Sequence, residues 1–158
     1  MLTLAPLQGV LHAAARTVLD LKLRDHVTPA LRKWHWLPIT ETIQYKLCLV
    51  VHKMFVRHAP DYIASLLTPA SDIRSRSSLR SSSNCDLVVP RTSWKIGDRA
   101  FSVAAPRAWS RLPTDLKLLR STASFKNKLK SFLLHPAYTI TLPITLPACY
   151  SCQLQLYN

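Results

Sequence analysis

The chain contains very little glycine and few acidic residues, and each shortage excludes a class of protein. It has 158 residues but only two glycines, so the glycine-rich loops that bind nucleotide phosphates are excluded. No two of its eight Asp and Glu residues are closer than five positions, so no local carboxylate cluster is available for catalytic metal ions. The six histidines lack the spacing of zinc ligands. We therefore expect a non-catalytic chain that uses no cofactor, metal or small-molecule substrate.

The four cysteines are scattered and do not suggest a disulfide framework. Cys149 and Cys152 form one CxxC motif, but no second ligand pair accompanies it, so we expect no zinc site. Cys48 falls on an apolar helix face, where cysteine acts as a small hydrophobic residue. Because nothing requires disulfides, we expect a reducing, intracellular compartment, nuclear or cytoplasmic. The uncharged C-terminal segment is interrupted by Pro143 and Pro147, so a membrane span is not expected.

Positive charge is abundant and favours a polyanionic partner. The 21 Lys and Arg residues give a net charge of +13, and residues 87–134 hold ten basic but only two acidic side chains. Each cation placed on a phosphate releases a condensed counterion, so this imbalance favours binding to RNA or DNA. The predicted phosphate contacts are Lys117, Arg120, Lys126, Lys128 and Lys130, with Arg91, Lys95, Arg99 and Arg107 as secondary contributors.

Hydrophobic periodicity predicts a mainly α-helical fold. We expect helices at 7–21, from the Thr28-Pro29 start to Trp34, at 40–58 with Thr40 as N-cap, and at 122–134. In the last helix, Phe125, Leu129 and Phe132 define the predicted buried face. The indoles of Trp34 and Trp36 either pack in the core or stack on nucleic-acid bases; the sequence leaves both interpretations open.

Extended segments and breaks are predicted between these helices. Residues 87–89 and 93–96 are expected to pair as a small β-hairpin. A helix is expected from residue 98 to 104, with a break at Pro106, and Trp109 and Leu112 are predicted core residues. The resulting segments are a helical part at 1–70, a Ser/Arg-rich linker at 71–86, a basic part at 87–138 and an unstructured, irregular tail at 139–158.

A set of motifs in this sequence resembles the region downstream of the polymerase core in LINE-type (non-LTR) retrotransposon reverse transcriptases. The resemblance covers roughly residues 11–138. The matching runs are Arg24-Asp-His-Val-Thr-Pro-Ala-Leu-Arg32, His35-Trp-Leu-Pro-Ile39, Ile43-Gln-Tyr-Lys-Leu-Cys-Leu-Val-Val-His-Lys53, Ala59-Pro-Asp-Tyr-Ile63, Val89-Pro-Arg-Thr92, Gly97-Asp-Arg-Ala-Phe-Ser-Val-Ala-Ala-Pro-Arg-Ala-Trp109, Leu112-Pro-Thr-Asp-Leu116 and Ser124-Phe-Lys126.

The resemblance implies a thumb and post-thumb segment without the catalytic palm. That family's Tyr-x-Asp-Asp motif is not present in this sequence, so no catalytic residue carries over. By position, the implied nucleic-acid role falls on the basic residues of 91–130. Three hypotheses stay open: a non-catalytic remnant that binds RNA or DNA, an inactive structural fragment, and a basic amphipathic peptide that lies on acidic membranes.

Overall fold

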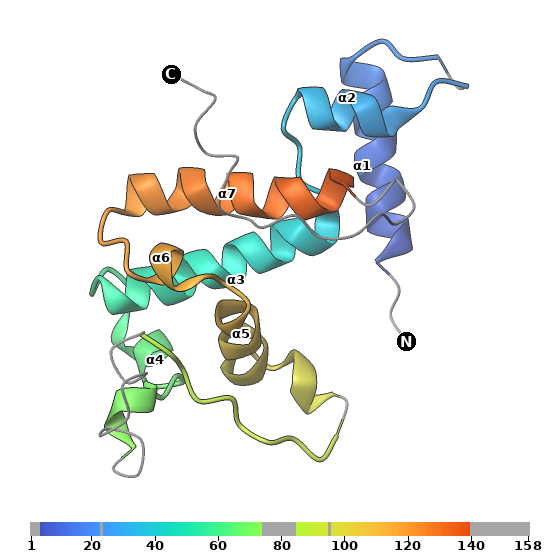
Figure 1. Cartoon of the computed structure of the whole chain (residues 1–158). Helices are drawn as coiled ribbons and strands as arrows, with labels where there is room; N and C mark the ends of the chain where they lie inside the picture. Colours follow the sequence, from blue (N-terminus) through green and yellow to red (C-terminus); the bar gives the residue numbers. More distant parts are fainter. Residues whose placement is uncertain (1–3, 23, 74–84, 95, 140–158) are drawn as a thin grey trace, which may run out of the picture.

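The structure, a computed structural model, is mainly helical in the part of the chain that it describes, which is residues 4–22, 24–73, 85–94 and 96–139 (Figure 1). The mainly α-helical prediction is therefore confirmed. The elements in chain order are α1 (Ala5–Val18), α2 (Val27–Lys33), α3 (Ile39–Phe55), α4 (Asp61–Ala64), the 3-10 turns η1 (Ala70–Asp72) and η3 (Gly97–Arg99), α5 (Phe101–Ser110), α6 (Thr114–Lys117) and α7 (Thr122–Thr139).

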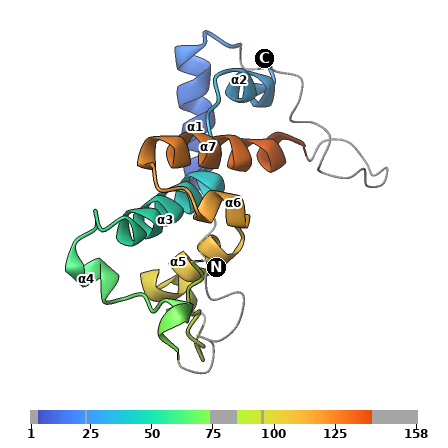
Figure 2. The same ribbon diagram turned by 60° about the vertical axis from the view of Figure 1, so that its left-hand side comes forward.

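Helix α3 lies at the centre of the molecule, between α5 on one side and α7 on the other (Figures 1 and 2). Its buried side chains are Cys48, Val51 and His52. Burial raises the pKa of the Cys48 thiol to about 12, so the thiol stays protonated and packs as a small apolar group. The predicted segments 1–70 and 87–138 thus share one hydrophobic core, because α3 belongs to the first and α5 and α7 to the second.

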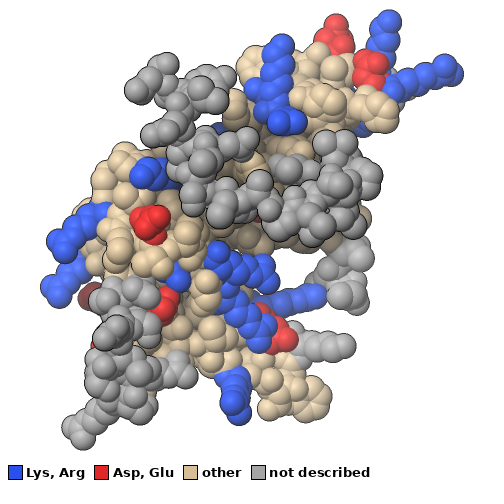
Figure 3. Space-filling model, in the orientation of Figure 1, with Lys and Arg blue, Asp and Glu red and all other residues tan. Residues whose placement is uncertain are grey.

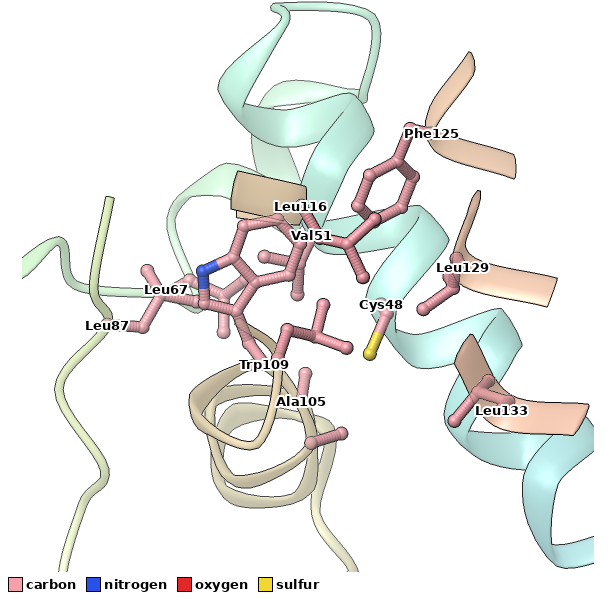
Figure 4. Close-up of a cluster of buried hydrophobic side chains, with 12 residues drawn as sticks. Cys48, Val51, Leu67, Leu87, Ala105, Trp109, Leu116, Phe125, Leu129 and Leu133 are labelled. Carbon is pink, nitrogen blue, oxygen red and sulfur yellow. The ribbon is translucent and has the colours of Figure 1, made fainter. Parts of the chain in front are cut away.

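Trp109 of α5 is the largest side chain in this core and is fully buried. Its ring stacks on Phe55 at 5.5 Å between centroids and lies 5.9 Å from Phe125. Its indole Nε1–H donates to the Cys85 carbonyl at 2.8 Å, which satisfies the polar end of the side chain. Figure 4 shows the Trp109 ring close to Leu67, Leu87 and Leu116, while Leu129 and Leu133 point toward α3. Trp109 and Leu112 are core residues, as predicted.

Helix α7 begins where the sequence predicts, but the third residue of its buried face differs from the predicted one. Phe125, Leu129 and Leu133 are buried, at successive steps of four, whereas Phe132 is exposed. A step of three or of four fits a period of 3.6 equally well, and packing against α3 selects the step of four. The helix also continues past its predicted end at 134 and contains Pro136.

Three predictions, one of a helix break at a proline and two of an N-cap residue, are wrong. Pro106 does not break the chain, because α5 begins at Phe101, later than predicted, and carries Pro106 inside it. Thr40 and Thr28 are not N-caps, because each lies inside its helix, after Pro38 and His26 respectively. No side-chain cap bond forms at either helix start.

The predicted β-hairpin at 87–96 is not formed, and no strand occurs in the described ranges. Residues 86–88 instead run antiparallel to residues 68–70. Ala70 N–H donates to the Asp86 carbonyl at 2.8 Å, and Val88 N–H donates to the Thr68 carbonyl at 2.9 Å. The apolar run therefore pairs with a segment far away in sequence, which turn signals do not reveal. Residues 74–84 of the predicted linker, and the predicted tail after Thr139, lie outside the described residues.

A second, smaller cluster holds α1 and α2 to the C-terminal end of α7. Ala15, Val27 and Leu31 are buried in it, and Trp36 and Tyr138 pack against them. The Tyr138 hydroxyl donates to the Trp36 carbonyl. Gln8 Oε1 of α1 accepts a bond from Ile39 N–H at 3.0 Å, which ties α1 to the start of α3.

Three helices end in the same backbone motif although no glycine is present there. The residue just after the cap of α1, α2 and α3 is Asp20, His35 and Arg57, with φ of 49°, 52° and 59°. In α2, His35 N–H donates to the Arg32 carbonyl at 3.1 Å and Trp36 N–H donates to the Leu31 carbonyl at 2.9 Å, the pattern of a Schellman motif. Glycine usually occupies this left-handed position. Because the sequence has so few glycines, non-glycine residues take this strained left-handed conformation at the three helix ends.

Candidate nucleic-acid interface

The nine basic residues predicted to contact phosphate fall into different environments. Lys95 lies outside the described residues. Lys117 is buried, with a side chain only 7% exposed, and its Nζ lies 2.7 Å from Asp86 Oδ1. A buried ammonium group that is already paired with a carboxylate is not available to an external phosphate. Lys117 therefore has a structural role, contrary to its predicted contact with phosphate.

Arg107 is also paired, although at the surface. Its Nη2 lies 2.9 Å from Asp98 Oδ1. Thr92 Oγ1 donates to the same Asp98 oxygen. The hydrogen bond from Thr92, followed by that from Arg107, lowers the pKa of Asp98 below its usual value. The charge of Arg107 is therefore largely engaged in holding the 3-10 turn η3 against α5.

The remaining six candidates are exposed but do not form one face. They are Arg91, Arg99, Arg120, Lys126, Lys128 and Lys130. On α7, Lys126 and Lys130 are four residues apart and share one side, whereas Lys128 lies on the opposite flank of the buried stripe. Figure 3 shows Lys and Arg in separate groups, over the α1–α2 end, at the left edge and at the lower centre, with acidic residues beside them. On this face, Lys and Arg do not form the single basic surface that the sequence predicts for the later half of the chain.

A groove between α2 and the C-terminal half of α7 brings together a different set of cations. Its volume is about 950 Å³. Helix α7 contributes side chains that recur along one side of the helix. The full lining is His26, Thr28, Pro29, Arg32, Lys33, His35, Ser131, Leu134, His135 and Tyr138.

The chemistry of this lining suits an anion. Arg32 and Lys33 supply two permanent positive charges, His26 and His35 add ring nitrogens, and Thr28 adds a hydroxyl donor. In the described part of the chain, the groove lining includes no carboxylate. Arg32 and Lys33 also occupy the last turn of α2, where cations offset the partial negative charge of a helix C-terminus.

The groove is held by packing beneath it. Val27 and Leu31 of α2 point into the small cluster, so the other side of α2 faces outward. Burial, and secondarily the Glu41 carboxylate, raises the pKa of Tyr138, and its hydroxyl donates to the Trp36 carbonyl. That bond joins the chain after α2 to the end of α7, and so fixes the two walls relative to each other.

Sequence reasoning missed this groove, because none of the nine predicted phosphate contacts is among its lining residues. The signal in the sequence was the dense run from Arg32 to His35, with Lys33 and Trp34 between them. Its partner wall is about a hundred residues away in sequence, and the Trp36–Tyr138 contact that pairs the two walls leaves no local pattern.

Comparisons with protein-family models, with curated proteins and with solved structures gave no match. The resemblance to LINE-type reverse transcriptases therefore stays a prediction carried by the quoted motifs alone. Within the ranges that the structure describes, no three His, Cys, Asp or Glu side chains come together as a metal site would require. The helices of those same ranges include none that is both long and apolar enough to cross a bilayer.

Proposed function

We propose that the chain is a non-catalytic nucleic-acid-binding module, a remnant of the C-terminal region of a LINE-type reverse transcriptase, and that it holds phosphates in the groove between α2 and α7. The observation that carries this proposal is the convergence of Arg32, Lys33, His26 and His35 on one groove, whose lining among the described residues contains no carboxylate. The net charge of +13 adds long-range attraction for a polyanion. The motif resemblance, which implies a segment that helps to hold template and primer, points to the same partner.

The contact is made by charge and by hydrogen bonds to phosphate oxygens. The Arg32 guanidinium presents a planar fork of donors that suits a phosphate, and the Lys33 ammonium acts as a point charge beside it. The Thr28 hydroxyl donates from the α2 wall, whereas the Ser131 hydroxyl on the α7 wall already donates to the Asn127 carbonyl. Such contacts position a nucleic acid without reading its sequence, so we expect little sequence preference.

The test is fluorescence anisotropy with a labelled oligonucleotide across a salt series. The Arg32→Gln/Lys33→Gln double variant removes two groove cations, and the Arg99→Gln/Lys126→Gln variant removes two exposed cations that do not line the groove as a charge-matched control. We expect the groove variant to flatten the slope of log K against log salt by about 1.4, from roughly 0.7 for each single-strand phosphate contact. The control variant should change it by less.

Two outcomes would contradict the proposal. One is a wild-type affinity that does not depend on salt, because phosphate binding releases counterions. The other is an equal loss in both double variants, because that would mean the total charge, and not the groove, determines binding. Far-ultraviolet circular dichroism of each variant confirms that the helices remain formed.

A second candidate function, a structural fragment whose apolar face packs on a missing partner domain, is favoured by α1. Leu7, Val10 and Val18 of this helix are 54%, 67% and 67% exposed. Exposed apolar patches mark interaction surfaces or aggregation sites. If this candidate is correct, Val10→Lys/Val18→Lys should reduce self-association in sedimentation velocity without weakening oligonucleotide binding. Unchanged self-association would count against it.

A further inference from the structure

An exposed indole stands in the chain between two residues that line the basic groove. Trp34 is the C-cap residue of α2 and is 57% exposed. Its two chain neighbours, Lys33 and His35, both line the groove. The Schellman turn at His35 reverses the chain here, so Trp34 is fixed at the point where the α2 wall ends. An exposed aromatic residue therefore follows directly, in the chain, the two cations proposed to bind phosphate.

The structure assigns different environments to the two tryptophans of this segment. Trp36 packs against the small cluster of Ala15, Val27 and Leu31, and its carbonyl accepts the Tyr138 hydroxyl bond. Trp36 is therefore a packing residue. Trp34 contributes no buried surface to either hydrophobic cluster, as those clusters are defined among the described residues. Its exposed ring is available to an external planar group.

We propose that Trp34 stacks on an unpaired base while Arg32 and Lys33 hold the adjacent phosphate, so that the ligand of the groove is a single-stranded nucleic acid. This proposal rests on the proposed function, because it names the ligand class of the same groove. Single-strand binders combine a positively charged groove along the backbone with aromatic side chains that stack on successive bases. In a duplex the base faces are covered by their neighbours, so an indole at the groove rim has no face to contact. The stacking contribution is therefore absent for duplex ligands.

The chain provides a matched control for this residue. Trp94 is also exposed, at 79%, but it lies just before η3, and its described neighbours in the chain do not line the groove, unlike those of Trp34. Replacing either indole removes a similar exposed aromatic surface. Because neither ring is part of a hydrophobic cluster, both variants should fold, and an unchanged midpoint of thermal unfolding verifies this. Only Trp34 should affect binding.

The experiment measures anisotropy with labelled oligothymidylate and with a blunt DNA duplex of the same length. We expect the wild-type chain to bind the single strand more tightly than the duplex. Trp34→Ala should raise the single-strand Kd about tenfold and leave the duplex Kd unchanged. Trp34→Phe should recover part of the loss, because phenylalanine retains a stacking face. Trp94→Ala should bind both ligands like the wild type.

The outcomes separate the two proposals. If the wild type shows salt-dependent binding but Trp34→Ala binds oligothymidylate equally well, the stacking proposal is overturned and the phosphate groove stands. A duplex that binds as tightly as the single strand overturns it as well. If the wild type binds neither ligand, both proposals fail together. Quenching of tryptophan fluorescence by oligothymidylate, lost in Trp34→Ala but kept in Trp94→Ala, gives an independent readout.

Discussion

The two hydrophobic clusters of this chain differ greatly in size, and the candidate site lies at the smaller one. Twelve buried residues from α3, α5, α6, α7 and the segments before them form the large cluster, whereas the small cluster buries only Ala15, Val27 and Leu31. Binding residues are drawn from the less stable parts of a fold, because those parts tolerate polar and exposed side chains. The groove wall formed by α2 is therefore expected to be the more mobile wall.

The largest expected effect compares the two clusters directly. Trp109→Ala should lower the free energy of unfolding by about 4 kcal/mol, because it opens a cavity in the large cluster and removes the indole bond to Cys85. Leu31→Ala in the small cluster should lower it by about 2 kcal/mol, because fewer neighbours surround it. Urea denaturation measures both. A Leu31 variant as destabilised as the Trp109 variant would remove the distinction between the clusters.

The next effect concerns the buried ion pair beside the large cluster. Asp86→Ala leaves the Lys117 ammonium buried without its partner and should lower the free energy of unfolding by about 3 kcal/mol. Lys117→Met replaces the buried lysine with an apolar side chain and leaves Asp86, which is 38% exposed, in contact with water. We expect that variant to lose only about 1 kcal/mol. An equal decrease in the free energy of unfolding in both variants would contradict this account, because the two partners of the pair differ in burial.

Glycine substitutions at the helix ends separate stability from binding. Arg57→Gly at the end of α3 and His35→Gly at the end of α2 both place glycine at a left-handed residue, and each should raise the free energy of unfolding by about 0.5 to 1 kcal/mol. Only His35 lines the groove, so only His35→Gly should weaken oligonucleotide binding. Thermal unfolding and anisotropy on the same two samples test this. A stabilised His35 variant that binds normally would exclude that imidazole from the interface.

The smallest effect is a pH dependence that arises in the large cluster. His52 is buried and stacks on Phe125 at 4.1 Å, and its Nε2–H donates to the Leu119 carbonyl at 2.7 Å. Because a carbonyl only accepts, the bond fixes the neutral tautomer with the proton on Nε2, and among the described residues Nδ1 has no partner. Burial, with a smaller contribution from His58, lowers the pKa of His52, against the opposing effect of the Leu119 bond.

The sign of this dependence follows from the lowered pKa. Between the ordinary histidine value near 6.5 and the lower folded value, the unfolded chain binds a proton that the folded chain does not. Stability should therefore be constant above about pH 6.5 and fall as the pH decreases below it. Urea midpoints at several pH values should show this decline in the wild type and in the exposed-residue control His26→Gln, but a weaker decline in His52→Phe. An unchanged decline in His52→Phe would assign it to other groups.

Much of the helical core could be predicted from local pattern, and the contacts that define the site could not. The spacing of apolar residues was sufficient to place α3 and α7, and the size of Trp109 was sufficient to place it in the core. Pattern alone does not distinguish Leu133 from Phe132, since the choice depends on how α7 lies on α3. Nor does it show that residue 87 pairs with residue 69 and not with 93–96.

Charge was the least reliable guide to the site. Lys117 belongs to the most basic stretch of the sequence, yet Asp86, 31 positions earlier, neutralises it in the interior. Conversely, Arg32 and Lys33 belong to a stretch with a modest net charge, and they gain a role only because the far end of α7 forms the opposite wall. The number of cations in a segment predicts the class of partner, whereas the tertiary contacts decide which cations meet it.

The most direct test of the account is a nuclear magnetic resonance titration of the isotope-labelled full chain with oligothymidylate. The amide signals of Val27–Lys33 and of residues 131–138, which form the two walls of the groove, should shift together and saturate at one ligand concentration. Signals of α5 and of the segment around Arg91 and Arg99 should shift little. Shifts confined to those latter residues, or spread evenly over every exposed lysine and arginine, would contradict the claim that the chain binds nucleic acid in this groove.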